Sequence, residues 1–366
     1  MSSASTTRSS LKEIPACTEF VEGILKKGRE VYVLHHWDAD GVASAAILLR
    51  VLGPRIVGMS TPKIGVYGAS ALNPDEIKKS GADTLVVLDY GARPDEVLAR
   101  VPQGVRALIV DHHAVELSDN ARRYCCNPVA LGMSEAEYPS TTWVLYELLD
   151  TPSDIVDLVA LGIVGDLGPA LATSEHVMFV DNVAAELSMT LNDFVRAVEL
   201  IDSCYRIVNS KCIEHAVQVL AEEGVRGVLR DEVLINARES ASRYVESAYD
   251  RLQSLEEPCP GVKIWKLSLD SLVTSYVGRS LARAYPDDVI LLAHNIPSLN
   301  VTYVYVRSYS VPLRRFLEKL REEGLNVGGK DMVFVATCSE GEDCDEVVSK
   351  ITTHLCRDLS KEGRQV

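Results

Sequence analysis

Four short segments of the chain carry carboxylates and imidazoles, the side chains that hold hard divalent metal ions. They are residues 36–41, Asp89, residues 111–113 and Asp166. Cations such as Mn²⁺ prefer these ligands, and two of them held about 3.5 to 4 Å apart need a shared carboxylate. No cysteine stands in these segments, which disfavours structural zinc. The sequence therefore predicts a site for two divalent cations, with the candidate ligands His36, Asp38, Asp40, Asp89, His112 and Asp166.

Three of these segments follow apolar runs that predict buried strands. The runs are Val31–Leu34, Thr84–Leu88 and Ala107–Val110. Uninterrupted aliphatic residues are typical of strands covered on both faces, as in a parallel sheet. Open α/β sheets bind ligands beyond the carboxyl ends of their strands, so we expect the polar residues after the runs to share one edge. A strand that merely ends in polar residues is the alternative for any single segment.

The first segment is expected to be extended. Side chains alternate along an extended backbone, so His36, Asp38 and Asp40 should point the same way. Gly41 should then allow a sharp turn into a helix over residues 42–52, whose first N–H groups favour anions. The alternative is an Asx-capped turn over the same residues.

The fourth segment has a different setting, because no strand precedes Asp166. Residues 154–164 form a helical apolar run, and Gly162, Gly165 and Gly168 are expected to break it around this acid. The pattern Gly-Asp-x-Gly alone is a weak signal and is usually a helix end followed by a turn. The pattern is informative here because it is the next segment with an acid after the three strand ends that carry acids.

Length and composition limit the class of protein. A chain of 366 residues is longer than one compact core usually needs, so two domains are expected after a disordered lead over residues 1–12. No uninterrupted apolar stretch of about 18 residues occurs, and we expect a soluble, cytoplasmic protein. The nine cysteines are scattered without a CxxC pair. Reduced, mostly buried thiols are expected, unless the source is a hyperthermophile, where a disulfide is possible.

The charge of the chain is unevenly distributed. A net charge of −15 argues against a broad basic surface that grips duplex DNA. Residues 261–331, however, hold ten lysines and arginines against seven acids. This stretch predicts a basic lobe able to bind phosphates, while acidic residues elsewhere hold metal ions.

The second half of the chain begins with predicted helices over residues 187–207, 210–223 and 231–255. The run Glu-Glu-Pro-Cys-Pro-Gly over residues 256–261 then breaks any helix. After it, predicted strands over residues 262–269, 288–293, 301–306 and 332–336 alternate with helices over 275–284, 311–323 and 343–359. This order indicates a helical connector followed by a second α/β domain.

The motifs His36-x-Asp38-x-Asp40-Gly41, Leu88-Asp89, Asp111-His112-His113 and Gly165-Asp166 resemble the four motifs of the DHH phosphoesterase superfamily. The first is most similar to that of archaeal RecJ-like single-strand exonucleases, and Asn127-Pro128 and Tyr138–Thr141 fit the same subgroup. The resemblance implies an α/β fold. A parallel-sheet DHH domain with helices on both faces would span residues 13–185, a helical connector 186–258, and a smaller mixed-sheet α/β DHH-associated domain 259–366.

The same resemblance implies a role for each residue of the site. His36, Asp38 and Asp89 would hold one Mn²⁺, and Asp40, Asp89, His112 and Asp166 would hold the other, with Mg²⁺ possible in place of Mn²⁺. Asp111 would orient an imidazole, and His113 would contact the scissile phosphate or help the leaving oxygen. His35 and Trp37 are extra and are expected to pack or to stack on substrate.

In the DHH-associated domain, the resemblance implies an Arg-Ser strand end and a Gly-Gly-Gly-His loop that grip a substrate phosphate. Arg307, Ser308, Gly328 and Gly329 match this pattern, but Lys330 replaces the third glycine. Asp331 replaces the histidine, and its carboxylate would repel a phosphate. Phosphate binding through a backbone nest and Lys330 is one expectation, and a plain turn without ligand is the other.

The function that the resemblance implies is a two-metal phosphodiesterase acting on single-stranded DNA or RNA or on short oligonucleotides, in DNA replication and repair. One alternative is a replisome scaffold associated with the GINS complex, with weak or no nuclease activity. Another is a small-molecule phosphatase, such as a pyrophosphatase or a cyclic dinucleotide hydrolase.

Overall fold

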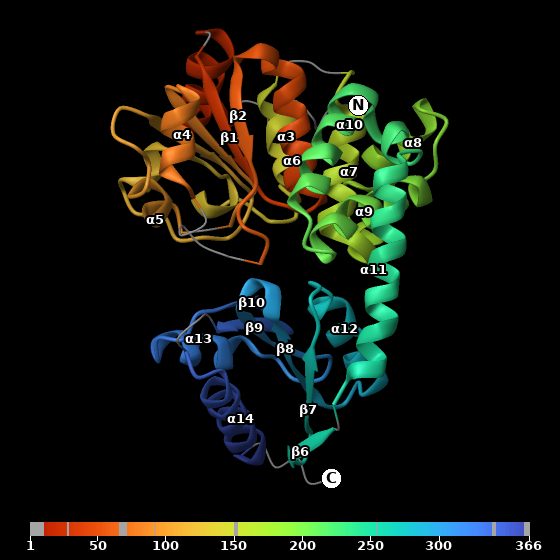
Figure 1. The fold of residues 1–366 in the computed structure, drawn as a ribbon. Coiled ribbons are helices and arrows are strands. Elements are labelled where there is room, and N and C mark those ends of the chain that lie inside the picture. The colour runs from red at the N-terminus through yellow and green to blue at the C-terminus, as the bar shows by residue number, and fades with distance from the viewer. Residues whose placement is uncertain are drawn as a thin grey trace. The chain divides into compact units, whose positions relative to one another are not determined.

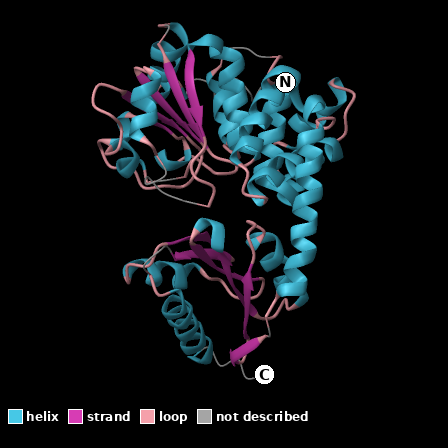
Figure 2. Ribbon diagram, viewed as in Figure 1, coloured by secondary structure: helices cyan, strands magenta, loops and turns pink. Residues whose placement is uncertain are grey.

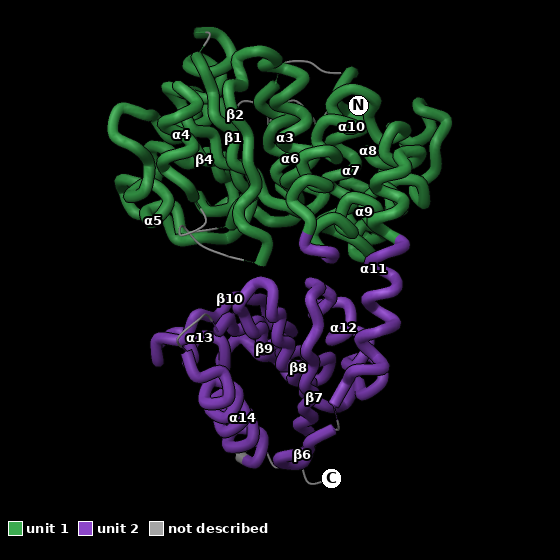
Figure 3. Tube along the Cα trace, in the orientation of Figure 1, with its two compact units in different colours: residues 1–205, 209–238 green, residues 206–208, 239–366 purple. Residues whose placement is uncertain are grey.

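The computed structural model describes residues 11–27, 29–65, 72–91, 93–149, 153–253, 255–338 and 342–361. Its contacts divide the chain into two compact units (Figure 3). Unit 1 comprises residues 1–205 and 209–238, and unit 2 comprises residues 206–208 and 239–366. Of the lead predicted for residues 1–12, Leu11 and Lys12 are described, and Leu11 is buried; the rest lies outside the described residues. The domain boundaries drawn from the sequence stay a prediction.

Unit 1 is built on a five-stranded parallel sheet with the strand order β2-β1-β3-β4-β5. Its strands are β1 Val31–His35, β2 Ile56–Ser60, β3 Thr84–Leu88, β4 Arg106–Val110 and β5 Cys125–Cys126. Every residue of β1 and β3 is buried, as their apolar runs predict. The register pairs His35 with Leu88 and Leu88 with Val110, so three strands end level at one edge.

Helices cover both faces of this sheet (Figures 1 and 2). On one face lie α4 Pro74–Ser80 and α5 Pro94–Leu98, where Ile77 and Val97 share a core with Leu85 of β3. On the other face α3 Ala39–Leu52 contacts β1 and β3, and α6 Thr141–Leu148 contacts β4. The predicted parallel-sheet α/β fold with helices on both faces is confirmed.

The other helices of unit 1 are α2 Pro15–Glu19, the π-helix η1 Phe20–Lys26, α7 Val156–Leu167, α8 Val177–Glu186, α9 Leu191–Arg206 and α10 Ser210–Val228. Short 3₁₀ turns cover Gly53–Arg55, Ala121–Arg123, Val129–Leu131 and Gly168–Thr173. A long helix, α11 Glu232–Arg251, begins in unit 1 and continues in unit 2. Helices α9, α10 and α11 correspond to the three helices predicted for the connector over residues 187–207, 210–223 and 231–255.

Helix α7 corrects the expectation that glycines break the chain around Asp166. The helix continues through Gly162 and Gly165 and ends at Leu167, with Gly168 as its C-cap, so Asp166 lies in its last turn. The glycines serve packing instead, because a Cβ at Gly162 would clash with Asp40 Oδ1 and one at Gly165 would lie 3.2 Å from a side chain of α3. α7 therefore approaches α3 closely enough to bring its acid to the site.

The start of α3 corrects a second expectation. Asp38 is extended, but Asp40 already lies in the first helical turn, so the two do not alternate along one extended segment. Asp38 caps the helix, since its carboxylate accepts a hydrogen bond from Gly41 N at 3.1 Å. Gly41 is needed for space, because a Cβ there would lie 2.5 Å from His36 O. The Asx-capped turn that was the alternative for this segment is therefore present, with Asp38 as the cap, and it occurs together with the cluster of acids.

Unit 2 contains a six-stranded mixed sheet with the order β10-β11-β9-β8-β7-β6, in which β7 and β8 are parallel and the other neighbours antiparallel. Its strands are β6 Glu256–Cys259, β7 Val262–Ser268, β8 Val289–Ile296, β9 Val301–Ser308, β10 Val327–Lys330 and β11 Val333–Cys338. Its helices are α12 Thr274–Ala284, α13 Arg314–Glu322 and α14 Cys344–Lys361, with a 3₁₀ turn at Pro297–Leu299.

The two faces of the second sheet have separate cores. Phe316 of α13 and Leu355 of α14 pack with Val304 and Val306 on one face. Helix α12 and the end of α11 pack on the other face with Tyr305. The predicted mixed-sheet α/β fold is therefore confirmed for this region as well.

Three disulfides correct the expectation of reduced thiols. They join Cys17 to Cys126, Cys204 to Cys212, and Cys259 to Cys356. The paired Cα atoms are 4.7, 5.3 and 5.8 Å apart, within the range that a disulfide spans. Two pairs are separated by 109 and 97 residues, so chain spacing gives no sign of them.

Among the described residues, one segment, Val156–Thr173, is long and apolar enough to cross a membrane. It consists of α7 and the 3₁₀ turn after it, and residues 158–164 of α7 are buried against neighbouring helices of unit 1. A core helix of a soluble protein meets the same test, so the segment is weak support for a membrane span.

Candidate metal centre

Two groups made up of the predicted ligands meet where β1, β3 and β4 end, and a third, overlapping group joins His113 to Asp89 and His112. In the first group, the ligand atoms of His36, Asp38 and Asp89 lie within 4.8 Å of one another. The second group, within the same limit, comprises Asp40, Asp89, His112 and Asp166. Asp89 belongs to both groups, so the six predicted ligands form one cluster around a shared carboxylate. Their role in holding metal ions stays a prediction.

Asp89 combines an unusual backbone conformation with a buried side chain. Its φ of 55° lies in the left-handed region, which residues other than glycine seldom adopt. The side chain is 1% exposed, and its Oδ1 accepts a hydrogen bond from Thr141 Oγ1 at 3.0 Å. Its buried Oδ2 has no hydrogen-bond partner in the described part of the chain. A strained backbone and an unsatisfied buried oxygen at one residue are typical of a functional site.

Asp40 is held by the first turn of α6. The backbone N–H of Thr141 donates to Asp40 Oδ2 at 2.7 Å, and that of Thr142 donates to Oδ1 at 3.1 Å. Ser140 caps the same helix by accepting from Trp143 N. Unpaired N–H groups at a helix start favour negative charge, so α6 stabilises the buried carboxylate.

Each of the two predicted imidazole ligands contacts a carboxylate of its own group. His36 Nδ1 lies 2.8 Å from Asp38 Oδ2, and His112 Nε2 lies 2.8 Å from Asp166 Oδ2. The other ring nitrogen of His112, Nδ1, faces the carbonyl of Tyr138 at 3.3 Å. With Nδ1 facing that carbonyl, Nε2 is the ring nitrogen that faces the acids and that would bind a metal ion.

Asp111 organises the segment after β4. Its Oδ1 accepts from the backbone N–H groups of His112 and His113, at 2.7 and 3.1 Å, and lies 2.7 Å from His113 Nδ1. Its Oδ2 accepts from Gly91 N at 2.9 Å. Asn127 Nδ2 donates to His113 O at 2.9 Å. The imidazole that Asp111 orients is thus that of His113, whose side chain is 43% exposed and open to a substrate.

Crowded buried acids dominate the electrostatics of the cluster. Burial, and then the charge of Asp40, raises the pKa of Asp89 well above its usual value. Burial and the neighbouring Asp166 raise the pKa of Asp40 to about 7. For His112 burial acts in the opposite direction, but Asp166 outweighs it and raises the pKa to about 9. Carboxylates pressed together in this way lack countercharge, and the donor set of acids and imidazoles fits hard divalent cations.

Unit 2 carries the predicted substrate-binding residues on β9 and β10. Gly328, Gly329 and Lys330 do not form a loop: they lie in β10, which pairs antiparallel with β11, and this corrects the sequence expectation. Lys330 pairs with Val333, which in turn pairs with Arg307. Directly paired residues share one face of a sheet, so the two cations lie on the same face, two strand spacings or about 10 Å apart.

Arg307 is held by aromatic neighbours. Its Nη1 donates to the hydroxyl of Tyr305 at 3.2 Å, and its guanidinium lies 4.9 Å from the ring centre of Tyr309. Its buried Nε lacks a hydrogen-bond partner among the described residues. A pre-positioned guanidinium with an unsatisfied donor suits an anionic ligand.

The neighbours of these two cations have structural roles. Ser308 is buried, and its hydroxyl accepts from the backbone N–H groups of Ser310 and Val311 at 3.1 and 3.0 Å, so it holds the turn after β9. Asp331 lies 2.5 Å from Arg314 Nε. The ion pair offsets the negative charge that the sequence suggested would repel a phosphate.

Sequence reasoning did not give Thr141, Thr142 or Gly162 a role at the site. Their contacts with the acids depend on where α6 and α7 begin and cross α3, and no local pattern signals that. His35 and Trp37 are 0% and 2% exposed, so both pack inside unit 1.

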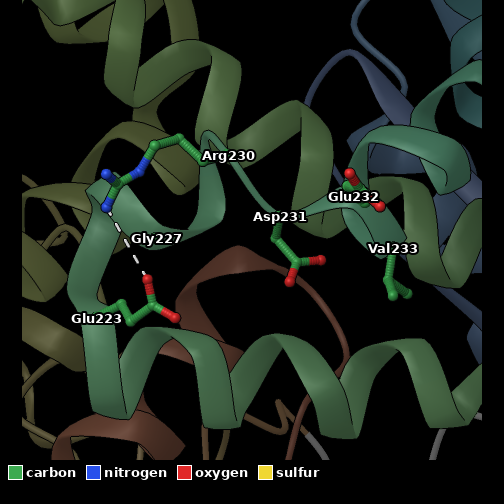
Figure 4. Close-up of a pocket in the computed structure, with 6 residues that line it drawn as sticks. All are labelled: Glu223, Gly227, Arg230, Asp231, Glu232 and Val233. Carbon is green, nitrogen blue, oxygen red and sulfur yellow. Dashed lines mark ion pairs between the residues drawn. The ribbon is translucent and has the colours of Figure 1, made fainter.

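A pocket elsewhere in unit 1 lies between the end of α10 and the start of α11 (Figure 4). It is lined by Glu223, Gly227, Arg230, Asp231, Glu232 and Val233. Arg230 and Glu223 approach to 3.9 Å across it. No predicted site residue lines this pocket, and its walls are mostly charged.

The fold and the motifs have counterparts in known proteins. The sequence profile of the DHH family, N-terminal domain, matches residues 30–163. No curated protein matches the chain by sequence. Among solved structures, RecJ from Thermus thermophilus in complex with Mn²⁺ is similar, with a TM-score of 0.65, 18% identity and 94% of this chain covered. The chain spans 55% of the length of that RecJ.

Two further structures are similar in fold. The DHH domain of a protein described as a member of a ribosomal protein family has a TM-score of 0.67 and 15% identity, with 96% of this chain and 92% of that one covered. The same RecJ in complex with Mg²⁺ has a TM-score of 0.58 and 16% identity, covering 94% and 52%. Residues 30–163 therefore match the DHH family, N-terminal domain, within a chain whose fold is similar to that of RecJ.

Proposed function

We propose that the protein is a metal-dependent phosphodiesterase that hydrolyses single-stranded nucleic acid or short oligonucleotides in the cytoplasm. The observation that carries this proposal is the pair of ligand groups joined at Asp89, a buried carboxylate with an unsatisfied oxygen. The donor set suits Mn²⁺ first and Mg²⁺ second.

The residues that would hold the two metal ions are those of the two ligand groups. One ion would take His36, Asp38 and Asp89, and the other Asp40, Asp89, His112 and Asp166. When bound, a pair of divalent cations supplies a nucleophile at neutral pH and neutralises charge that develops on the phosphoryl group.

His113 is proposed to contact the scissile phosphate. Asp111 holds its Nδ1 at 2.7 Å, so Nε2 is the ring nitrogen left for a phosphate oxygen. The partial exposure of this side chain, in contrast to the buried acids beside it, gives a substrate access to that atom.

Unit 2 is proposed to bind the nucleic-acid backbone. Arg307 and Lys330 offer two cations on one sheet face, with the partly buried Val333 between them. On such a face, the phosphates of a nucleic-acid strand could contact the two separated cations, and its apolar parts could contact Val333. Two cations on one sheet face favour single strands or short oligonucleotides over a duplex, which needs many phosphate contacts.

End-labelled single strands of DNA and RNA of several lengths, incubated with Mn²⁺, Mg²⁺ or EDTA, test this proposal. We expect Mn²⁺-dependent release of mononucleotides or shortening of the strands, abolished by EDTA. Parallel reactions with inorganic pyrophosphate and a cyclic dinucleotide separate the small-molecule alternative. Hydrolysis of those compounds without cleavage of any strand would refute the proposed substrate class.

Association with the GINS complex, the scaffold role suggested by the family resemblance, is a separate proposal about partners. An Asp89→Asn variant distinguishes it, because a scaffold keeps its partner when a metal ligand is lost. Capture of purified GINS complex by both wild type and variant would support it, and failure of both to bind would remove it.

A further inference from the structure

Thr141 contacts two carboxylates that come from different parts of the chain. It is the first residue of α6 and is 0% exposed. Its hydroxyl donates to Asp89 Oδ1, after β3, at 3.0 Å, and its backbone N–H donates to Asp40 Oδ2, in α3, at 2.7 Å. One residue therefore joins the shared carboxylate to a carboxylate of the second ligand group.

The chemistry of a threonine side chain makes this contact directional. The hydroxyl donates its one proton to Asp89 Oδ1 and leaves Oδ2 as the unsatisfied oxygen, and a carboxylate that binds a metal ion can only accept from it. Threonine has few χ1 rotamers, and the backbone of Thr141 is fixed by α6 and by its bond to Asp40. The hydroxyl thus limits how the Asp89 carboxylate can rotate relative to Asp40.

We propose that Thr141 is a positioning residue that sets the spacing and orientation of the Asp89 and Asp40 carboxylates, and thereby the affinity for the second divalent cation. This inference rests on the proposed two-metal function. Thr141 acts through the two acids and is assigned no contact with substrate. The competing account is that its hydroxyl only satisfies a buried hydrogen bond, in which case losing it lowers stability and leaves metal binding unchanged.

Three variants at this position separate the two accounts. Thr141→Val removes the hydroxyl and keeps the β-branched shape, while Thr141→Ser keeps the hydroxyl. Thr141→Ala removes the same hydroxyl with less bulk and replaces the valine variant if that one does not fold. Thr84→Val is the matched control, because Thr84 is equally buried, starts the strand that precedes Asp89, and bonds instead to Asp83.

Titration of the metal-free protein with Mn²⁺, followed by calorimetry and by EPR, gives a readout independent of activity. We expect wild type, Thr141→Ser and Thr84→Val to bind two ions and to show the exchange-coupled EPR signal of a Mn²⁺ pair. In Thr141→Val the affinity for the second ion should fall roughly 10- to 100-fold, as is usual when a residue that orients a ligand is lost. The coupled signal should weaken in parallel.

The outcomes that overturn the inference are distinct. If wild type binds two Mn²⁺ ions and both Thr141→Val and Thr141→Ala bind them equally well, Thr141 has no positioning role, although the proposed function survives. If Thr141→Ser loses as much affinity as Thr141→Val, the hydroxyl is not the responsible group. A wild-type protein that binds no Mn²⁺ would remove the proposed function, and this inference with it.

Discussion

The two units bring charged residues together by different geometric rules. In unit 1 Asp89 follows one of three parallel strands that end level, and helices α3 and α7 bring Asp40 and Asp166 to the same edge of the sheet. Asp40 and Asp89 are buried there. In unit 2 antiparallel pairing places Arg307 on β9 and Lys330 on β10, on either side of β11, on a face rather than at an edge. The edge of a parallel sheet thus gathers donors into one cluster, whereas an antiparallel region spreads cations over a surface.

The burial of the two sets differs accordingly. Asp40 and Asp89 are each 1% exposed, and helix N–H groups balance part of the charge of Asp40. In the proposed function, metal ions would balance the rest. Lys330 is exposed and needs no such balance. We expect changes in unit 1 to alter catalysis and metal binding strongly, and changes in unit 2 to alter substrate affinity moderately.

The largest effect is expected from Asp89→Asn. The amide keeps the shape but removes the shared negative charge, so a metal pair loses several kcal/mol of stabilising interaction, or roughly a 10³-fold loss in kcat. Initial rates on a labelled single strand with saturating Mn²⁺ measure it. Asp75→Asn, at an exposed acid in the first turn of α4, is the control. Retention of near wild-type turnover by Asp89→Asn would break the contrast between the units.

The next effect concerns stability and should be similar in both units. Replacing both cysteines of the Cys17–Cys126 pair, or of the Cys259–Cys356 pair, by alanine releases a long loop in the unfolded chain. We expect each change to lower the free energy of unfolding by roughly 2 to 4 kcal/mol. The Cys204–Cys212 pair spans only 8 residues and should matter less. Denaturant unfolding measures all three, and a larger loss from the short pair would contradict this account.

A pH effect is expected in unit 2, far along the chain from the acid cluster. Burial lowers the pKa of His294 to about 4, from an ordinary value of 6.5, although its bond to the carbonyl of Leu269 acts in the other direction. The unfolded chain therefore takes up a proton on this residue before the folded one does. The stability that neutral His294 contributes is complete above pH 6.5 and is lost as the pH falls toward 4.

Replacing His294 by Gln should weaken that pH dependence. The free energy of unfolding is measured with urea at pH 7 and at pH 4.5. Between these pH values it should fall by about 2 kcal/mol less in the variant than in wild type. The variant should be less stable at pH 7, because it loses the 2.7 Å contact between Thr274 and His294 Nδ1. If the free energy of unfolding depends on pH equally in the variant and in wild type, groups other than His294 cause that dependence.

The smallest effect is expected from Lys330→Ala. An exposed cation that meets a phosphate contributes about 1 kcal/mol, so the KM for a single strand should rise roughly fivefold while kcat stays nearly constant. Lys350→Ala is the matched control, because Lys350 lies on α14 and pairs with Glu323 at 3.0 Å. If kcat falls and KM does not change, the face on unit 2 does not bind substrate as proposed.

Much of this arrangement could be predicted from the sequence. Three apolar runs that end in acids or histidines became β1, β3 and β4, and all six predicted ligands meet in one cluster. Those predictions succeeded because strand-end residues in a parallel sheet converge whatever the details of side-chain packing. The extended form of Asp40 and the glycine break near Asp166 were wrong, because helix packing decided both.

By itself the sequence determined the type of sheet in unit 1, the donors at its edge and the basic character of the stretch that became much of unit 2, since local periodicity and residue chemistry carry that information. Only the tertiary structure decided that Thr141 reaches Asp40 across 101 residues, that Cys17 meets Cys126, and that Arg307 and Lys330 share a face. Such contacts depend on the crossing of helices and on strand register, which are fixed when distant elements pack together.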